Sequence, residues 1–211
     1  MSKIERFEGD ILSSNVFVVS EGDRCVLIDA GVPLKLLLPK LGSKKVEAIV
    51  LTHGHYDHIY YLQEYAKHFG CDVFGSKFIA EYLYDKNHNA SEGSPYPAIE
   101  LLPIEKLKTF DDAGKKKIGP IELEYLQLGG HSKADMLYKL GDNIFVGDIV
   151  IGRDVGRQDL WGGNKKQMVN SLHKLLDVEY QTMHCGHGHD LDKNTQNKVI
   201  NLWAKFLSRN N

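Results

Sequence analysis

Thr52-His53-Gly54-His55-Tyr56-Asp57-His58 is the most informative stretch of this sequence, and it directly follows an apolar run at residues 48–51. Three imidazoles and one carboxylate crowd into six positions, a density that packing alone does not require. Neutral imidazoles together with a carboxylate suit zinc or a similar divalent ion. Gly54 lets the backbone approach a neighbour closely between the first two histidines. The stretch therefore predicts a buried strand that runs into a metal-binding loop.

Length and composition indicate a globular protein with no strong electrostatic bias. The chain has 211 residues, of which 42% are hydrophobic, so we expect one domain over residues 1–211 with a substantial core. The formal net charge of -2 gives no reason to expect nucleic acid or an anionic membrane as a partner. The basic run Lys115-Lys116-Lys117 is isolated, and we expect it in a solvated turn.

Cysteine usage and the N-terminus indicate a cellular compartment. The three cysteines are far apart, form no C-x-x-C pair and leave an odd one over, which is typical of a reduced, intracellular protein. Residues 1–10 carry charges and lack the apolar segment of a signal peptide. No apolar stretch approaches the roughly 18 residues of a membrane span. We therefore expect a cytoplasmic protein.

Short β-like runs alternate with turns and helical patterns along the chain. Residues 16–19 and 25–29 are expected to be strands joined by a hairpin-like turn at Glu21-Gly22-Asp23. Further strands are expected at 46–51, 72–74, 121–128, 136–140, 144–146 and 181–184, and helices at 34–41, 59–69, 77–84, 165–176 and 194–207. Residues 85–108 are irregular, which is uncommon unless a loop serves a site. Two β-rich halves with helices favour two packed sheets covered by helices on the outside.

Three more potential ligands lie beside glycine, just past the end of an expected strand: His131, Asp148 and His187. Strand ends of one sheet system share an edge, so these side chains could converge on the first stretch. By spacing alone, His184 and His189 compete with His187. The combined set would be large enough for two metal ions with open positions, which is typical of a catalytic rather than a structural site.

These motifs resemble the metallo-β-lactamase-fold hydrolases, in their small glyoxalase II-like (hydroxyacylglutathione hydrolase-like) branch. The H-x-H-x-D-H signature is residues 53–58, and His131, Asp148 and His187 are in the order of the later signatures. The early Asp-Thr-Gly of the family corresponds to Asp29-Ala30-Gly31, and the glycine-rich stretch 147–163 also matches. The resemblance spans residues 10–188, and five motifs in the correct order make it specific.

The resemblance implies an α+β fold, an αββα sandwich of two mixed β-sheets with helices on both outer faces. It also implies two metal sites that share one carboxylate. The first site would be held by His53, His55 and His131, the second by Asp57, His58 and His187, and the bridge would be Asp148. Asp29 would orient the ligand loops from behind, and Asp57 would also be catalytic.

The implied reaction is hydrolysis of a small thioester or ester acyl bond by a hydroxide that bridges two divalent ions. Zinc is the first expectation for these ions, with iron or manganese as alternatives. A mononuclear iron enzyme resembling the persulfide dioxygenases, with iron held by His53, His131 and Asp148, is the main alternative. A lactonase and a binding protein without turnover are further ones. The expected partner is a small acyl substrate, and the sequence does not indicate an oligomeric state.

The chain departs from the family pattern near the site. Lys133 and Ala134 stand where members usually have Pro-Gly after the third ligand, and Tyr60 and Tyr61 stand where members usually have two glycines. Lys133 and Arg157 are therefore candidate substrate-binding residues, although Arg157 could instead pair with a carboxylate such as Asp159. One helix after His187 replaces the long helical extension that holds glutathione, so glutathione is not the expected acyl carrier.

Overall fold

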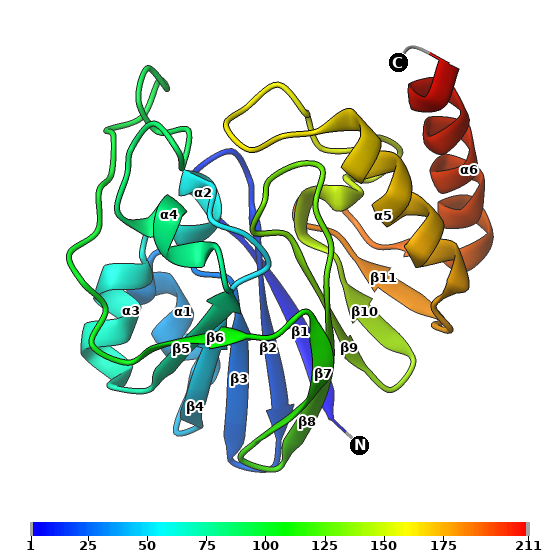
Figure 1. Cartoon of the computed structure of the whole chain (residues 1–211). Helices are drawn as coiled ribbons and strands as arrows, with labels where there is room; N and C mark the ends of the chain where they lie inside the picture. Colours follow the sequence, from blue (N-terminus) through cyan, green and yellow to red (C-terminus); the bar gives the residue numbers. More distant parts are fainter. Residues whose placement is uncertain (1, 210–211) are drawn as a thin grey trace.

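The computed structural model describes residues 2–209, and two six-stranded sheets form its centre (Figure 1). The first sheet contains, in spatial order, β1 (Lys3–Glu8), β2 (Asn15–Glu21), β3 (Arg24–Ile28), β4 (Lys45–Val50), β5 (Asp72–Ser76) and β6 (Leu107–Phe110). Neighbours pair antiparallel from β1 to β3 and in parallel from β3 to β6. The predicted hairpin around Gly22 joins β2 and β3, as expected.

The second sheet is also mixed. Its spatial order is β12 (Leu191–Asp192), β11 (Thr182–His184), β10 (Asn143–Phe145), β9 (Met136–Leu140), β8 (Ile121–Gln127) and β7 (Ala113–Ile118). Strands β10 and β11 pair in parallel, and the other neighbours pair antiparallel.

Helices cover the outer face of each sheet, so the predicted αββα sandwich is confirmed (Figure 1). The helices are α1 (Leu34–Leu41), α2 (Tyr56–Ile59), α3 (Leu62–Phe69), α4 (Ile79–Leu83), the 3-10 turn η1 (Gly147–Ile149), α5 (Lys165–Asp177) and α6 (Lys193–Arg209). In Figure 1, α1, α3 and α4 lie beside the first sheet, and α5 and α6 lie beside the second. Among residues 2–209, no helix combines the length and apolar character needed to cross a lipid bilayer.

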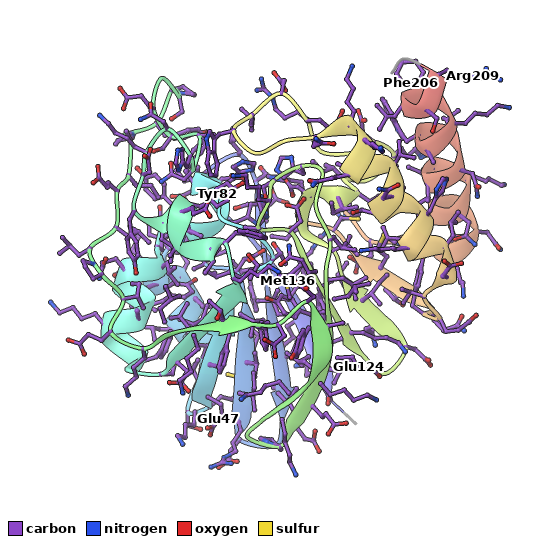
Figure 2. The ribbon with its side chains drawn as sticks, in the orientation of Figure 1. Glu47, Tyr82, Glu124, Met136, Phe206 and Arg209 are labelled. Carbon is purple, nitrogen blue, oxygen red and sulfur yellow. The ribbon has the colours of Figure 1, made fainter. Side chains whose placement is uncertain are left out.

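Strand alternation explains why the sheets are buried on both faces. In β2, Val16 and Val18 face the helices α1 and α3, whereas Phe17 and Val19 face the other sheet. Successive side chains of a strand point to opposite faces, so an unbroken apolar run fills two cores at once. Met136, labelled at the centre of Figure 2, belongs to the core between the sheets.

The helix α5 shows how local sequence sets an element boundary. Asn164 caps it by accepting a hydrogen bond from the Gln167 amide at 2.9 Å, as predicted. Its buried face contains Met168, Leu172 and Leu175, which recur at the three- and four-residue spacing of an amphipathic helix. Burial of these three side chains holds α5 against the second sheet. It also holds the start of the glycine-rich stretch 147–163, which precedes α5 and contributes to the same core.

One prediction about the surface is wrong. Lys115-Lys116-Lys117 lies in strand β7, the edge of the second sheet, and not in a turn. Its three side chains are exposed, and charged residues on an edge strand discourage pairing with another chain. Strands β1, β6 and β12 were also not expected from the sequence, because each is short or only partly buried and so lacks a clear apolar alternation.

Candidate metal centre

The predicted ligands converge at one end of the two sheets. The first stretch follows β4 and forms the start of α2, while the loop from β8 to β9 brings His131 to the same place. Asp148 lies in η1 just after β10, and His187 follows β11. Four loops that are far apart in the sequence therefore meet at one edge, in the region of α2 in Figure 1.

Seven side chains form overlapping groups whose geometry could hold metal ions. The groups are His53, His55 and His131; His53, His58 and Asp148; and Asp57, His58 and His187. Within the first, Nδ1 of His55 and Nε2 of His131 are 2.6 Å apart. Within the third, Nε2 of His187 lies 3.1 Å from an Asp57 oxygen. All but His187, which is half-buried, are buried.

Asp148 lies between the two outer groups. Its Oδ2 is 3.6 Å from Nε2 of His131 and 3.3 Å from Nε2 of His187. Its Oδ1 is 3.4 Å from Nε2 of His58. This one carboxylate therefore lies close to nitrogen atoms of both sets, as a bridge between two ions would.

Hydrogen bonds behind the cluster fix the orientation of four imidazoles. His131 donates from Nδ1 to the Arg157 carbonyl at 2.8 Å, and His187 donates from Nδ1 to the Leu12 carbonyl at 3.0 Å. His58 donates from Nδ1 to Oδ2 of Asp29 at 2.9 Å. With Nδ1 occupied in this way, Nε2 of each ring is directed at the centre, which is the arrangement of a metal-ligating histidine with an outer partner.

Asp29 also orients the fourth imidazole, through Thr52. The carboxylate of Asp29 accepts hydrogen bonds from the amide and the hydroxyl of Thr52, both at 2.7 Å. Because the Thr52 hydroxyl proton is committed to Asp29, its oxygen accepts from Nδ1 of His53 at 3.1 Å. Asp29 is held at φ +64°, a left-handed conformation that Asp tolerates better than most residues. The residue predicted to orient the loops therefore lies directly behind them.

The donor atoms fit the divalent ions that the fold family implies. Nε2 of His53 and Oδ1 of Asp148 are buried without a hydrogen-bond partner among the described residues, as is Nε2 of His55. Buried polar atoms are normally satisfied, so the unsatisfied Nε2 of His53 and Oδ1 of Asp148, two residues of one ligand group, indicate a missing partner. Imidazole and carboxylate are ligands of zinc, iron and manganese.

Electrostatics divides the cluster into two parts. Burial holds the pKa of His53 and of His55 well below the usual histidine value, and the neighbouring imidazoles act in the same direction, so both rings are neutral. For His58 and His187 burial also lowers the pKa, but the carboxylates of Asp57 and Asp148 outweigh it. The pKa of His58 is well above its usual value, and that of His187 is raised to about 10. The side of the centre near Asp57 therefore stabilises positive charge.

Two glycines allow this close packing. A Cβ at Gly54 would overlap the Tyr82 side chain, which confirms the expected close approach at that position. A Cβ at Gly186 would overlap Oδ1 of Asp148 and come within 2.9 Å of Cε1 of His58. Side chains at these positions would push the ligand groups apart.

The candidate substrate-binding residues have different surroundings. Arg157 forms a two-point ion pair with Asp159, at 2.8 and 2.6 Å, as the structural alternative predicted, yet it also lines the cavity beside the centre. Lys133 is not among the residues that line this cavity. Its ammonium lies 4.3 Å from the centre of the Trp161 ring. The structure therefore does not bring Lys133 to the centre.

The competing residues lie outside the cluster. His184 stacks on Phe145 with ring centroids 4.7 Å apart, and His189 contacts the guanidinium of Arg6 at 2.9 Å. Cys185 is buried in the core beneath α5 and α6, as expected for a packing residue. Tyr61 donates a hydrogen bond to Asp10, and Tyr60 stacks edge-on against Tyr61.

The sequence did not predict the walls of the cavity, which has a volume of about 560 Å³. Besides the ligand groups and Arg157, it is lined by Leu12, Tyr56, Ala90, Glu92, Gly93, Ser94, Pro95, Ile151 and Leu160. The irregular composition of residues 85–108 was the one signal that a loop might serve a site. The exposed Leu12 had none, since its position depends on left-handed backbone at Leu12 and Ser13.

Comparison with curated proteins identifies the family. Residues 9–193 match the model of the metallo-beta-lactamase superfamily. The chain is 32% identical over 202 residues to "Probable metallo-hydrolase YqgX" of Bacillus subtilis, covering 92% of this chain and 94% of that protein. It is 25% identical over 170 residues to "Hydroxyacylglutathione hydrolase GloC" of Haemophilus influenzae, covering 77% of this chain and 79% of that protein.

Solved structures agree with this assignment. The B3 metallo-beta-lactamase BLEG-1 superposes with a TM-score of 0.83 at 24% identity, over 92% of this chain and 96% of that one. TTHA1623, solved in a di-iron-bound form, superposes with a TM-score of 0.78 at 26% identity, over 92% of this chain and 98% of that one. Since the family model spans most of the sequence and the fold agrees, the chain belongs to the metallo-beta-lactamase superfamily.

Proposed function

We propose that this protein is a hydrolase of small thioesters or esters that works with two divalent metal ions. One observation carries the proposal: four imidazoles present Nε2 to a common centre while their Nδ1 atoms are occupied by outer hydrogen bonds. Such an arrangement is expected of metal ligands and has no use in packing. The membership of a metallo-hydrolase superfamily agrees with it.

Two sets of ligands support two ions rather than one. We assign His53, His55 and His131 to one ion, Asp57, His58 and His187 to the other, and Asp148 to both. When bound, ions at these groups would lower the pKa of water and polarise an acyl carbonyl. Zinc suits the donor set. The di-iron form of TTHA1623 supports iron as an alternative, and the donor chemistry also allows manganese.

The chain's own residues would orient the reactants and move protons. We assign Asp57, which lines the cavity, as the group whose carboxylate oxygen accepts a proton from the water that attacks the acyl carbon. When the acyl bond breaks, the leaving thiolate or alkoxide would take up that proton. Asp29 would hold Thr52 and His58 in place throughout, because its two oxygens already accept three hydrogen bonds from them.

The cavity walls favour a small, largely apolar acyl group. Leu12, Pro95 and Leu160 provide apolar surface beside the ligand groups. Arg157 is already paired with Asp159, so it offers little to a carboxylate-bearing carrier such as glutathione. The name of GloC, a hydroxyacylglutathione hydrolase, supports thioester cleavage as the reaction class, and the paired Arg157 argues for a different thiol or alcohol.

The persulfide dioxygenase alternative needs only one ion. It is less well supported, because Asp57, His58 and His187 form a second complete group of potential ligands. We further propose a cytoplasmic location, since Cys25, Cys71 and Cys185 are free thiols.

The deciding experiment is an activity panel with metal-loaded protein. Under anaerobic conditions we expect hydrolysis of short acyl thioesters or esters, measured by release of the thiol or acid, with lactones as a parallel arm. Asp57→Asn should abolish most of it. A separate assay in air measures oxygen uptake with a persulfide. Oxygen uptake there, together with no thioester cleavage in the anaerobic assay, would contradict the proposal.

A further inference from the structure

Trp161 packs against residues of one helix and two loops beside the cavity. Its indole stacks on the imidazole of His88, with ring centroids 3.5 Å apart and planes 12° from parallel. The ammonium of Lys133 lies 4.3 Å from the centre of its ring. Tyr82, labelled in Figure 2, packs edge-on against the indole, with ring centroids 5.1 Å apart. The indole is thus held between residues of α4, the following loop and the ligand loop, and we call these four residues the Trp161 clamp.

Each loop in the clamp continues into a wall of the cavity. His88 precedes the lining segment 90–95, and Trp161 follows the lining residue Leu160. Tyr82 accepts a hydrogen bond from the Lys133 amide at 2.8 Å and donates one to the Trp161 carbonyl at 3.4 Å. The clamp therefore ties the two wall segments to each other and to α4.

The ligand loop has a separate support. The carboxylate of Asp135 is buried and accepts hydrogen bonds from the amides of His131 and Ser132 at 3.0 and 2.9 Å. It also accepts one from the hydroxyl of Ser132 at 2.5 Å. Since these contacts lie inside the loop, His131 does not depend on the indole for its position.

We propose that Trp161 is a positioning residue that fixes both cavity walls, segment 90–95 and Leu160, and thereby sets the affinity for substrate without holding the metal ligands. The affinity part rests on the proposed hydrolase function. The clamp uses Lys133, where the family usually has proline, so it is a feature of this chain's own loops. Ring stacking and the cation–π contact are the forces that hold it.

The test compares Trp161→Ala and Trp161→Phe with wild type and with Phe69→Ala. Phe69 is a matched control, because it is a partly buried aromatic residue on the same core cluster as Trp161, and its ring packs against Tyr65 and His68 rather than against a residue of the clamp. Hydrogen–deuterium exchange of the metal-loaded proteins without substrate reports on the walls directly. We expect the amides of 86–96 and 156–163 to exchange about tenfold faster in Trp161→Ala, with partial rescue in Trp161→Phe and no change in Phe69→Ala.

Kinetics and metal analysis complete the test. We expect KM to rise about tenfold in Trp161→Ala while kcat changes by less than about threefold and the metal content stays that of wild type. Unchanged exchange, or metal loss that parallels the change in KM, would overturn the proposal. If the wild type cleaves no thioester or ester, the hydrolase function fails instead, and the exchange difference still decides whether Trp161 positions the walls.

Discussion

Asp29→Asn tests the support behind the metal ligands most sharply. The substitution preserves size, and Asn tolerates the left-handed φ of +64° as well as Asp does, so the backbone should not change. One Asp29 oxygen accepts from the Thr52 amide, and the other accepts from both the Thr52 hydroxyl and Nδ1 of His58. Whichever way the Asn amide is turned, its NH2 group faces an N–H donor, either the Thr52 amide or Nδ1 of His58, and that hydrogen bond is lost.

The expected loss of metal affinity follows from the loss of this outer hydrogen bond. Loss of an outer partner of a metal-ligating histidine typically weakens metal binding by about 10- to 100-fold, which corresponds to about 1.4–2.7 kcal/mol. Competition against a chromophoric chelator measures the affinity for zinc in wild type and variant. Asp112→Asn is the matched control, because it removes an exposed carboxylate that pairs with Lys77 and belongs to none of the ligand groups. An affinity of Asp29→Asn within about twofold of wild type would refute the reasoning.

Three further predictions follow from burial and charge. Removing metal with a chelator should lower Tm by on the order of 10 °C, because a ligand at about 1,000 times its Kd stabilises the folded state by about 4 kcal/mol. Calorimetry with and without added zinc checks this. An unchanged Tm would speak against bound metal. Gly186→Ala should lower metal content and destabilise the fold by about 1–3 kcal/mol through overlap with Asp148, whereas Gly42→Asn, in open space, should keep full metal content. Burial raises the pKa of Cys25 and Cys71 to about 11, so about one thiol in a thousand is ionised at pH 8. Iodoacetamide labelling of the native protein should therefore be slow and rise about tenfold per pH unit towards pH 10, and rapid labelling at pH 8 would contradict the burial of these thiols.

Much of the fold was predictable because the apolar pattern is strong. The run at residues 15–21 fills two cores, and the helix after Asn164 has a clear cap and a regular buried face. The sequence pattern fails for β7, where Lys115-Lys116-Lys117 is exposed and only the ladder with β8 makes it a strand. β8 follows β7 after only Gly119 and Pro120, so the partner is close in sequence, but the exposed lysines of β7 lack the apolar alternation that would mark a strand.

The ligand groups were predictable from strand-end positions together with the family resemblance, which favours His187 over His189. His131, Asp148 and His187 each lie beside glycine just past a strand end, and the sheet topology then brings strand ends together. The cavity walls had no such signal. Leu12 reaches the site through an unusual backbone conformation, and Leu160 is held there by the neighbouring Trp161, so both depend on tertiary contacts.

The most direct measurement is the metal content of the chain by elemental analysis, after exchange into metal-free buffer and reloading with zinc, iron or manganese in separate samples. We expect two ions per chain, falling to about one when His187→Ala removes a ligand of the second group alone. A wild-type protein that retains no ion under any of these conditions would contradict this expectation.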